Sequence, residues 1–329
     1  MPLTACFLAR AAMVIAAAIL AMPMAHAQKY PSKPITLYVP FTAGGGSDLL
    51  ARSVTQRVGE RIGQTFVIEN RPGAGTTIAA NAVARAAADG YTLMQGTSST
   101  MAINVSMFKS LAYQPLEDLV PVAFVARSPF FLVVNPSSPV KSVKDLIALA
   151  KEKPKGLNFG SGGLGSMHHL STELLMSLTG TEMTHVMYKG TPPALLDLLA
   201  GRLDVLFGDA TTTLPQIRQG RVRALGVTTA KRSPAAPDVP TVEEAGVPGF
   251  ETASWHMIVA PKGTPPEIIA LLNREVREVF KDEKLVKELT ERGVGPVVTG
   301  PPQELEAFVK NEIKRWSEIN KRAGIAGTL

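Results

Sequence analysis

Short apolar runs alternate with longer amphipathic stretches along most of this chain, which is the pattern of strands followed by helices. In the first half, strands are predicted at residues 35–41, 66–69 and 91–94, and helices at residues 50–62 and 78–88. Leu50, Val54, Val58 and Ile62 fall four residues apart and therefore lie on one helical face. This βαβαβ order predicts a mainly parallel sheet with helices on both faces.

The same order begins again in the middle of the chain. Strands are predicted at residues 157–159, 203–207 and 222–227, and helices at residues 145–152, 168–178, 191–200, 266–280 and 303–323. Thr191 followed by Pro192 is typical of an N-cap with proline at the first helical position. Gly180 and Gly201 are the expected helix ends.

Two such halves in one chain place a ligand where the carboxyl ends of their strands face each other. The apolar runs at residues 122–134 and 253–259 are the expected strands that cross between the halves. We therefore predict a discontinuous first lobe, residues 28–128 and 253–329, and a second lobe, residues 129–252.

The first 27 residues have the pattern of a secretory signal peptide. Arg10 precedes an apolar stretch that ends at Ala25, and Ala25-His26-Ala27 is a small-residue cleavage site. The apolar stretch is shorter than the roughly 20 residues that span a bilayer, so export with cleavage after Ala27 is expected rather than a membrane anchor. Cys6 lies in a lipoprotein-like box, but no basic segment or apolar core precedes it. Cleavage after Ala27 would leave no cysteine, which excludes disulfides and thiolate sites.

The composition is that of a globular protein, with 45% hydrophobic and 19% charged residues. The formal net charge of +6 raises the question of nucleic acid binding. The basic residues alternate with acids, however, as in residues 281–292 (KDEKLVKELTER), which is typical of a solvated helix face. No basic run carries interleaved aromatic residues, so we expect no nucleic acid binding. With the signal peptide removed, we also expect no insertion in a membrane.

The segment at residues 40–48 (PFTAGGGSD) joins a predicted strand directly to a helix through three glycines. The unsatisfied N–H groups and partial positive charge of a helix N-terminus favour a carboxylate or phosphate there. The loop matches neither the Walker A motif nor the dinucleotide fingerprint. Asp48 leaves a second interpretation open, because its carboxylate could cap the helix and repel an anion.

The second half repeats this arrangement at residues 160–166 (GSGGLGS), before the helix that contains His168 and His169. One glycine loop in each half, each opening a helix, is what a clamp around a ligand requires. Contacts to the ligand are therefore expected at Ser161, Gly162, Gly165 and Ser166.

Other polar positions carry weaker signals. Residues 96–101 form a hydroxyl-rich stretch after a strand, which is equally well explained as a polar loop. Residues 188–191 precede a predicted helix and residues 209–211 follow a predicted strand, and a ligand contact or a structural role is open for both. His168 and His169 are adjacent on a helix, so their side chains diverge by roughly 100° and cannot share one ion. Ser47 and Ser166 lack the Gly-x-Ser-x-Gly context of a hydrolase. We predict no catalytic residue, no metal site and no cofactor.

Several motifs together resemble the substrate-binding proteins of tripartite tricarboxylate transporters, the TctC or Bug (Bordetella uptake) family. They are residues 30–35 (YPSKPI), 39–41 (VPF), 44–48 (GGGSD), 69–75 (ENRPGAG), 88–93 (ADGYTL), 188–190 (YKG), 197–201 (DLLAG) and 237–246 (PDVPTVEEAG). The matches run through almost the whole chain after residue 27. The resemblance implies a type II periplasmic binding protein fold: two α/β lobes joined by two crossing strands, with a ligand cleft between them.

The resemblance also implies how the ligand is held, namely by backbone groups and hydroxyls, with one carboxylate against the first loop. Carried onto this chain, the ligand-binding residues are Phe41, Thr42, Ala43, Gly46, Ser47, Asp48, Ser98, Ser161, Gly165, Ser166, His169 and Asp209. The chain departs from the family at Thr42-Ala43, where a proline is usual, at Ser47, where threonine is common, and at Thr100-Met101, where many members have Ser-His.

The function implied is capture of a small carboxylate-bearing ligand, such as an organic acid, amino acid or aromatic acid, for tripartite uptake or for sensing. The expected partners are the membrane subunits of a transporter or a sensor kinase, and the protein itself is expected to be a monomer. Two other classes stay open from the residues alone: a periplasmic serine hydrolase, and a periplasmic module that binds or signals to another protein.

Overall fold

The computed structural model describes residues 30–296, 300–322 and 324–328. Met1–Ser32 separates as a unit of its own from Lys33–Leu329, and every described helix and strand belongs to the second unit. The predicted signal peptide and its cleavage site at Ala27 lie outside the described residues.

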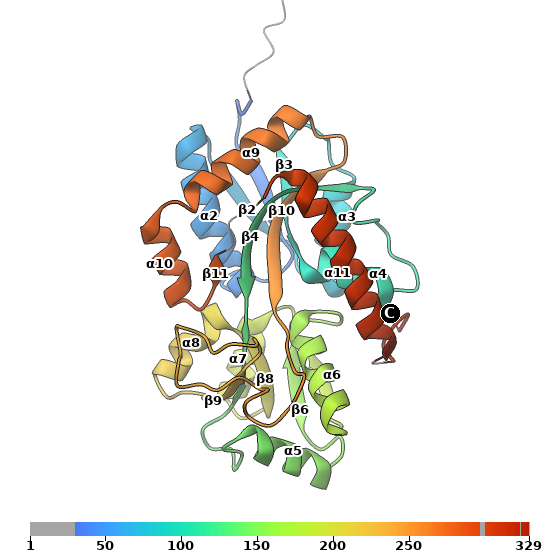
Figure 1. Cartoon of the computed structure of the whole chain (residues 1–329), viewed down its shortest axis with the longest axis vertical. Coiled ribbons are helices and arrows are strands. Elements are labelled where there is room, and N and C mark those ends of the chain that lie inside the picture. Colours follow the sequence, from blue (N-terminus) through green and yellow to red (C-terminus); the bar gives the residue numbers. More distant parts are fainter. Residues whose placement is uncertain (1–29, 297–299, 323, 329) are drawn as a thin grey trace, which may run out of the picture. The chain divides into compact units, whose positions relative to one another are not determined.

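The first sheet is built from the two ends of this unit (Figure 1). Its order within the described residues is β11 (Gly295–Pro296), β4 (Leu119–Ser128), β10 (Ser254–Pro261), β3 (Thr92–Thr97), β1 (Ile35–Val39) and β2 (Phe66–Asn70). Strand β1 pairs in parallel with β2 and β3, whereas β10 pairs antiparallel with β3 and β4. The sheet is therefore mixed, which corrects the expectation of a mainly parallel one. The parallel pairs come from the βα repeats, and the antiparallel ones from strands that lead to or from the second sheet.

The second sheet is formed by the middle of the chain. Its order is β7 (Thr184–Met187), β6 (Asn158–Ser161), β8 (Val205–Asp209), β5 (Phe130–Val134) and β9 (Arg223–Val227) in the described chain. β6 is parallel to β7 and β8, and β5 is antiparallel to β8 and β9. Only Pro129 separates β4 in the first sheet from β5 in the second, so this run crosses between the sheets as the apolar pattern predicted.

The return crossing differs from the prediction. Strand β10 lies wholly in the first sheet, and the segment before it is held to the second sheet by a hydrogen bond from the Thr252 N–H to the Thr228 carbonyl. Ser171 Oγ and Thr252 Oγ1 lie 2.7 Å apart and fix the same segment to helix α6 (Met167–Thr179). The second crossing is therefore an extended connection at residues 252–253 that leads into a strand.

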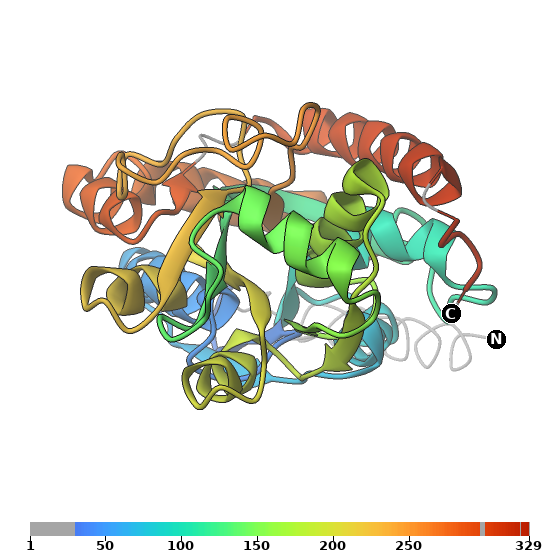
Figure 2. The same cartoon turned by 90° about the horizontal axis from the view of Figure 1, so that it is seen from below.

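Helices cover both sheets. Around the first sheet lie α2 (Gly46–Ile62), η1 (Ala74–Thr76), α3 (Thr77–Ala84), η2 (Ser99–Ile103), α4 (Asn104–Met107), α9 (Pro266–Val279), α10 (Glu283–Glu291) and α11 (Pro302–Arg322). The second sheet is packed by α5 (Val143–Glu152), α6, α7 (Thr191–Leu199) and α8 (Ala210–Arg218), which Figure 2 shows around its strands in green and yellow. Helix α2 packs on α9, and Leu50, Val54 and Val58 of its predicted apolar face are buried.

Two local predictions were wrong, and one helix was not predicted. Helix α7 has Gly190 as its N-cap, with Thr191 already inside the first turn. Residues 96–101 are no polar loop, because β3 continues to Thr97 and η2 begins at Ser99, with every side chain buried. Helix α8 was not foreseen at all, since Pro215 lies inside it and polar residues dominate its sequence.

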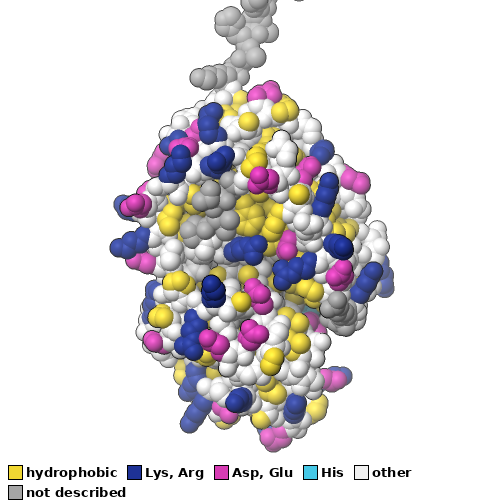
Figure 3. Space-filling model, in the orientation of Figure 1, with side chains coloured by type: hydrophobic (Ala, Val, Ile, Leu, Met, Phe, Trp, Pro, Cys, Tyr) yellow, Lys and Arg dark blue, Asp and Glu magenta, His cyan; other side chains and the backbone are white. Residues whose placement is uncertain are grey.

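The charged surface follows the alternation seen in the sequence. Figure 3 shows Lys and Arg side chains interspersed with Asp and Glu on the face drawn. On α10, Arg292 pairs with Glu288 at 3.2 Å and Lys287 with Glu291 at 3.9 Å, both at the i,i+4 spacing. The predicted solvated helix face at residues 281–292 is thus confirmed.

Candidate functional site

The first glycine loop leads from the carboxyl end of β1 into α2. Gly45 is the N-cap of α2, and no side chain caps the helix. The first N–H groups of a helix have no partner within the helix, and here no cap side chain satisfies them. Gly44, Gly45 and Gly46 at this start have no side chains of their own to cover these amides. The start of α2 therefore has the uncapped N–H groups on which the expectation of an anion site was based.

Asp48 does not cap α2 in the way the sequence allowed. Its carboxylate reaches back to accept a hydrogen bond from the Gly44 N–H at 2.9 Å, and Arg52 Nε donates to it at 3.0 Å. Asn70 Nδ2 donates to the same carboxylate at 3.1 Å. Burial raises the pKa of Asp48, but the hydrogen bonds from Arg52, Gly44 and Asn70 outweigh it and hold the pKa below its usual value. Asp48 thus holds the first glycine loop through its hydrogen bond with Gly44, and its charge is paired with that of Arg52.

The second glycine loop leads from β6 into α6 and is closed by its own side chains. Ser166 is the N-cap of α6, and its hydroxyl accepts from the His169 N–H at 3.4 Å and donates to the Gly163 carbonyl at 2.6 Å. The Ser161 hydroxyl accepts from the Gly163 N–H at 3.0 Å. The start of α6 therefore already has a hydroxyl cap, unlike the start of α2.

A stack of rings supports the second loop. The rings of His169, His185 and Phe159 lie beside one another in nearly parallel planes. The His185 centroid is 4.4 Å from that of His169 and 4.8 Å from that of Phe159, and the His169 and Phe159 centroids are 6.2 Å apart. His185 Nε2 lies 2.6 Å from Ser161 Oγ. Burial, with a smaller contribution from His169, lowers the pKa of His185 to about 3.

This serine–histidine pair does not have the properties of a hydrolase site. A general base is effective when its pKa lies near the working pH, and the pKa of His185, about 3, lies far below neutral pH. Among the described residues, no carboxylate forms a hydrogen bond with the His185 ring to orient it. Ser161 is fully buried. The pair is a structural support of the loop.

The two lobes touch through these loops. The Thr42 N–H donates to the Lys189 carbonyl at 3.3 Å, and the Ser99 hydroxyl donates to the Gly165 carbonyl at 3.0 Å. The Phe41 ring meets the His168 ring edge-on, with centroids 6.3 Å apart.

Between these contacts lies a cavity of about 10 Å³, lined by Phe41, Gly45, Gly46, Ser47, His168, Gly190, Thr191 and Asp209. That is about the room for one water molecule. The lobes are closed on each other in this structure, and a ligand requires them to separate.

Asp209 lies at the centre of this contact. His168 Nε2 lies 3.3 Å from its Oδ1, and the Thr191 hydroxyl donates to its Oδ2. Burial raises the pKa of Asp209, and the opposing effects of His168 and Thr191 hold it below its usual value. The side chain is 18% exposed. A carboxylate of the second lobe, ionised at neutral pH, therefore faces the start of α2 in the first lobe.

His256 lies behind this contact on β10. Its Nδ1 is 3.4 Å from Gln95 Nε2, and its side chain is buried. Burial lowers the pKa of His256 to about 4, although the charge of Asp209 acts in the opposite direction. His256 is thus neutral near pH 7.

The structure brings some of the predicted site residues together and leaves others apart. Phe41, Gly46, Ser47 and Asp209 line the cavity. Thr42 and Gly165 make the backbone contacts between the lobes, while Ser98 is fully buried and shares a hydrogen bond with Ser254. Hydrogen bonds within the second glycine loop involve Ser161, Ser166 and His169. Asp48 accepts a hydrogen bond from the first loop, and Ala43 is exposed.

His168 was not among the expected ligand-binding residues, since the sequence was used only to exclude an ion shared by His168 and His169. His168 lines the cavity and contacts both Asp209 and Thr191. Its position two residues after the N-cap of α6, at the cleft end of that helix, is the signal that could have singled it out.

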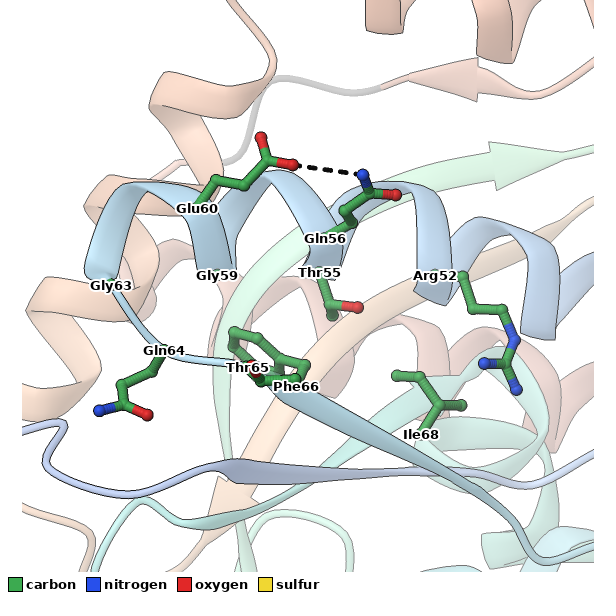
Figure 4. A pocket seen from close by; sticks show the side chains of 10 residues that line it. All are labelled: Arg52, Thr55, Gln56, Gly59, Glu60, Gly63, Gln64, Thr65, Phe66 and Ile68. Carbon is green, nitrogen blue, oxygen red and sulfur yellow. Dashed lines mark hydrogen bonds between the residues drawn. The ribbon is translucent and has the colours of Figure 1, made fainter.

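A larger hollow lies on the first lobe alone, between α2 and the edge strand β2 (Figure 4). Its volume is about 630 Å³, and it is lined by Arg52, Thr55, Gln56, Gly59, Glu60, Gly63, Gln64, Thr65, Phe66 and Ile68. Gln56 Nε2 donates to Glu60 Oε1 at 3.2 Å along its rim, as the dashed line marks. The groove contains no helix N-terminus and no group from the second lobe, so it lacks the features of the cleft.

Comparison with known proteins identifies the family. The family model described as "Tripartite tricarboxylate transporter family receptor", TctC, matches residues 50–325. The chain belongs to the TctC family. The protein BugT of Bordetella pertussis is 40% identical over 311 residues, which cover 94% of this chain and 95% of BugT.

Solved structures agree with the family. "R. palustris Rpa4515 with adipate" is 45% identical, with a TM-score of 0.87, over 90% of this chain and 99% of that one. MatC from Rhodopseudomonas palustris with bound malate is 36% identical, with a TM-score of 0.83, over 88% of this chain and 99% of MatC. The periplasmic binding protein BugD is 33% identical, with a TM-score of 0.86, over 90% of this chain and 99% of BugD.

These matches decide the fold and the class of function. Two mixed sheets flanked by helices, with neighbours of this kind, confirm the predicted two-lobed periplasmic binding protein fold. TctC proteins are periplasmic solute receptors of tripartite transporters, so the chain is a binding protein and no enzyme. Among the described residues, no helix is long and apolar enough to cross a membrane.

Proposed function

We propose that this TctC protein captures a small carboxylate-bearing molecule between its lobes, with one carboxylate at the start of α2. The observation that carries the proposal is the uncapped N-terminus of α2 at the surface where the two lobes meet. Such a terminus attracts a carboxylate without any lysine or arginine. The adipate named with Rpa4515 and the malate named with MatC support this ligand class, which includes organic, amino and aromatic acids.

The ligand-binding residues proposed from the sequence remain the proposed set, and the geometry adds Gly45, His168, Gly190 and Thr191 to it. In this proposal Phe41, Gly46 and Ser47 contact the ligand from the first lobe. Asp48 acts through the shape of the loop, and Ser161, Ser166 and His169 through the shape of the second loop.

The lobes are proposed to be residues 28–128 with 253–329, and residues 129–252. Membership of the two sheets supports these boundaries, because β4 and β10 lie in the first sheet and β5 and β9 in the second. Ligand binding would then shift an equilibrium between separated and closed lobes. We propose that the exported protein, cleaved after Ala27, acts as a monomer that delivers the ligand to the membrane subunits of a tripartite transporter or to a sensor kinase.

A thermal-shift screen of mono-, di- and tricarboxylates, amino acids and aromatic acids tests the proposed function. A ligand that binds only the folded state raises the unfolding midpoint, and calorimetric titration of each positive compound gives its dissociation constant. Methyl esters of the same acids are the control, because they keep the carbon skeleton and lack the charge. The proposal is wrong if no carboxylate raises the midpoint, or if the esters bind as tightly as the acids.

A further inference from the structure

Three helices begin around the carboxylate of Asp209. Asp209 is the N-cap residue of α8, and Thr191 in the first turn of α7 donates its hydroxyl to it. From the first lobe, Gly46 begins α2, and a Cβ built on Gly46 would lie 2.9 Å from the Asp209 Cβ. Helix N-termini attract negative charge. In the closed structure, the protein's own carboxylate therefore lies beside the position proposed for the carboxylate of the ligand.

In the closed structure the charge of Asp209 is offset by His168, by the Thr191 hydroxyl and by the helix starts around it. The lining contains no lysine or arginine, and His168 is the basic side chain that contacts the carboxylate. His256 is the other histidine near Asp209, and it is neutral near pH 7 because burial lowers its pKa to about 4. The nearby Asp48 is already paired with Arg52 at 3.0 Å. Asp209 thus carries the negative charge of the second-lobe wall with no lysine or arginine beside it, and its side chain is 18% exposed.

Separation of the lobes moves Asp209 away from α2, because the two lie on opposite walls. A ligand whose carboxylate binds at α2 then directs its other end toward Asp209 and Thr191. A second carboxylate at that end meets a like charge, whereas an ammonium meets a partner and an apolar end meets no repulsion.

We infer that Asp209 selects the charge of the ligand: the cleft prefers a monocarboxylate with an uncharged or cationic far end over a dicarboxylate of the same length. The inference rests on the proposed function and narrows its ligand class. It also makes adipate, the compound named with the 45% identical Rpa4515, an informative probe for this chain.

Two ligand series of matched length test the inference by calorimetric titration at pH 8 and constant ionic strength. The first series is hexanoate, 6-aminohexanoate and adipate, and the second is butanoate, 4-aminobutanoate and succinate. For wild type we expect at least one of the first two members of a series to bind on the order of tenfold more tightly than its dicarboxylate.

The variant Asp209→Asn removes the charge and keeps the size of the side chain. We expect the preference to shrink severalfold in this variant, mainly because the dicarboxylate binds more tightly. Asp238→Asn is the matched control, since Asp238 is exposed on the same lobe and the change in net charge is identical. Circular dichroism and the unfolding midpoint verify that both variants are folded.

An unchanged ratio in a folded Asp209→Asn variant, an equal change in Asp238→Asn, or wild-type binding restricted to dicarboxylates overturns the inference and leaves carboxylate capture standing. Failure of every carboxylate in both series and in the wider screen overturns the proposed function, and this inference with it.

Discussion

The two glycine-rich loops have the same plan along the chain, since each joins a strand to a helix, but their helices begin differently. At the first loop, Gly45 leaves α2 without a side-chain cap, and Asp48 holds the loop from inside the helix. At the second loop, Ser166 caps α6 with its hydroxyl. The first loop thus presents uncapped N–H groups to the cleft, while the second has its own hydroxyl cap.

This difference shows that a glycine-rich turn before a helix does not by itself define an anion site. Whether the helix start can bind an anion depends on the residue at the N-cap and on the direction in which nearby carboxylates point. The sequence suggested a ligand bridging the starts of α2 and α6. The geometry favours α2 from the first lobe, opposed by the wall that Thr191 and Asp209 form in the second.

The largest effect is expected for Gly46→Ala, which alters the uncapped loop. The added Cβ would project toward Asp209, 2.9 Å from its Cβ in this structure, and would occupy space at the proposed position of the ligand carboxylate. The backbone at Gly46 is helical, so the fold tolerates alanine. We expect affinity for the tightest carboxylate of the screen to fall on the order of a hundredfold, or about 2.7 kcal/mol. Titration calorimetry measures this, and undiminished affinity would remove α2 from the site.

A smaller effect is expected for Asp48→Asn, which removes the anchor behind the first loop. The carboxylate accepts hydrogen bonds from Gly44, Arg52 and Asn70, and an amide cannot accept all of them. Loss of a buried charged acceptor should lower the free energy of unfolding by about 2 kcal/mol. Urea denaturation measures the loss, with Asp238→Asn as the control for net charge. A change within the error of the control would show that the loop holds its shape without Asp48.

The variant Ser166→Ala tests the other side of the comparison. It removes the cap of α6, so we expect the free energy of unfolding to fall by about 1 kcal/mol. Affinity for the carboxylate should change less than threefold, because the ligand carboxylate is proposed to lie at the start of α2 and not at that of α6. A loss of affinity as large as that of Gly46→Ala would mean that both loops hold the ligand, as the sequence suggested.

The smallest effect concerns acid stability. The pKa of His185 is about 3 in the folded protein, whereas an unfolded histidine titrates near 6.5. The unfolded state therefore binds the extra proton between these values, and stability decreases as the pH falls from about 6.5 toward 3. Partial exposure of His185 reduces its contribution at pH 5 to about 1 kcal/mol or less.

His185→Gln removes this titration and keeps a polar group for Ser161. The unfolding midpoint of the variant should decrease less steeply than that of wild type between pH 6.5 and pH 4. His256 contributes the same sign down to its pKa of about 4, so some slope should remain. Parallel midpoint curves for the variant and wild type would contradict the low pKa of His185.

The helices and strands that the sequence predicted well are those in which apolar spacing matches a single period. The face of α2 and the stop of α6 at Gly180 are local features, and local sequence was sufficient for them. Helix α8 was missed because a proline lies inside it and its contacts with β5 and β8 stabilise it from outside. Residues 96–101 looked like a polar loop because hydroxyl spacing does not reveal that the surrounding elements bury it.

The sequence by itself determined the family, the two α/β halves and the two glycine loops at the carboxyl ends of strands, since all of these follow from short-range patterns. Tertiary structure alone decided which helix start is uncapped and that His168, Thr191 and Asp209 meet Gly46 across the lobes. These residues come from four separate helix starts, and only the packing of the two sheets brings them together. The charge that a ligand meets depends on such distances, which no local pattern of residues encodes.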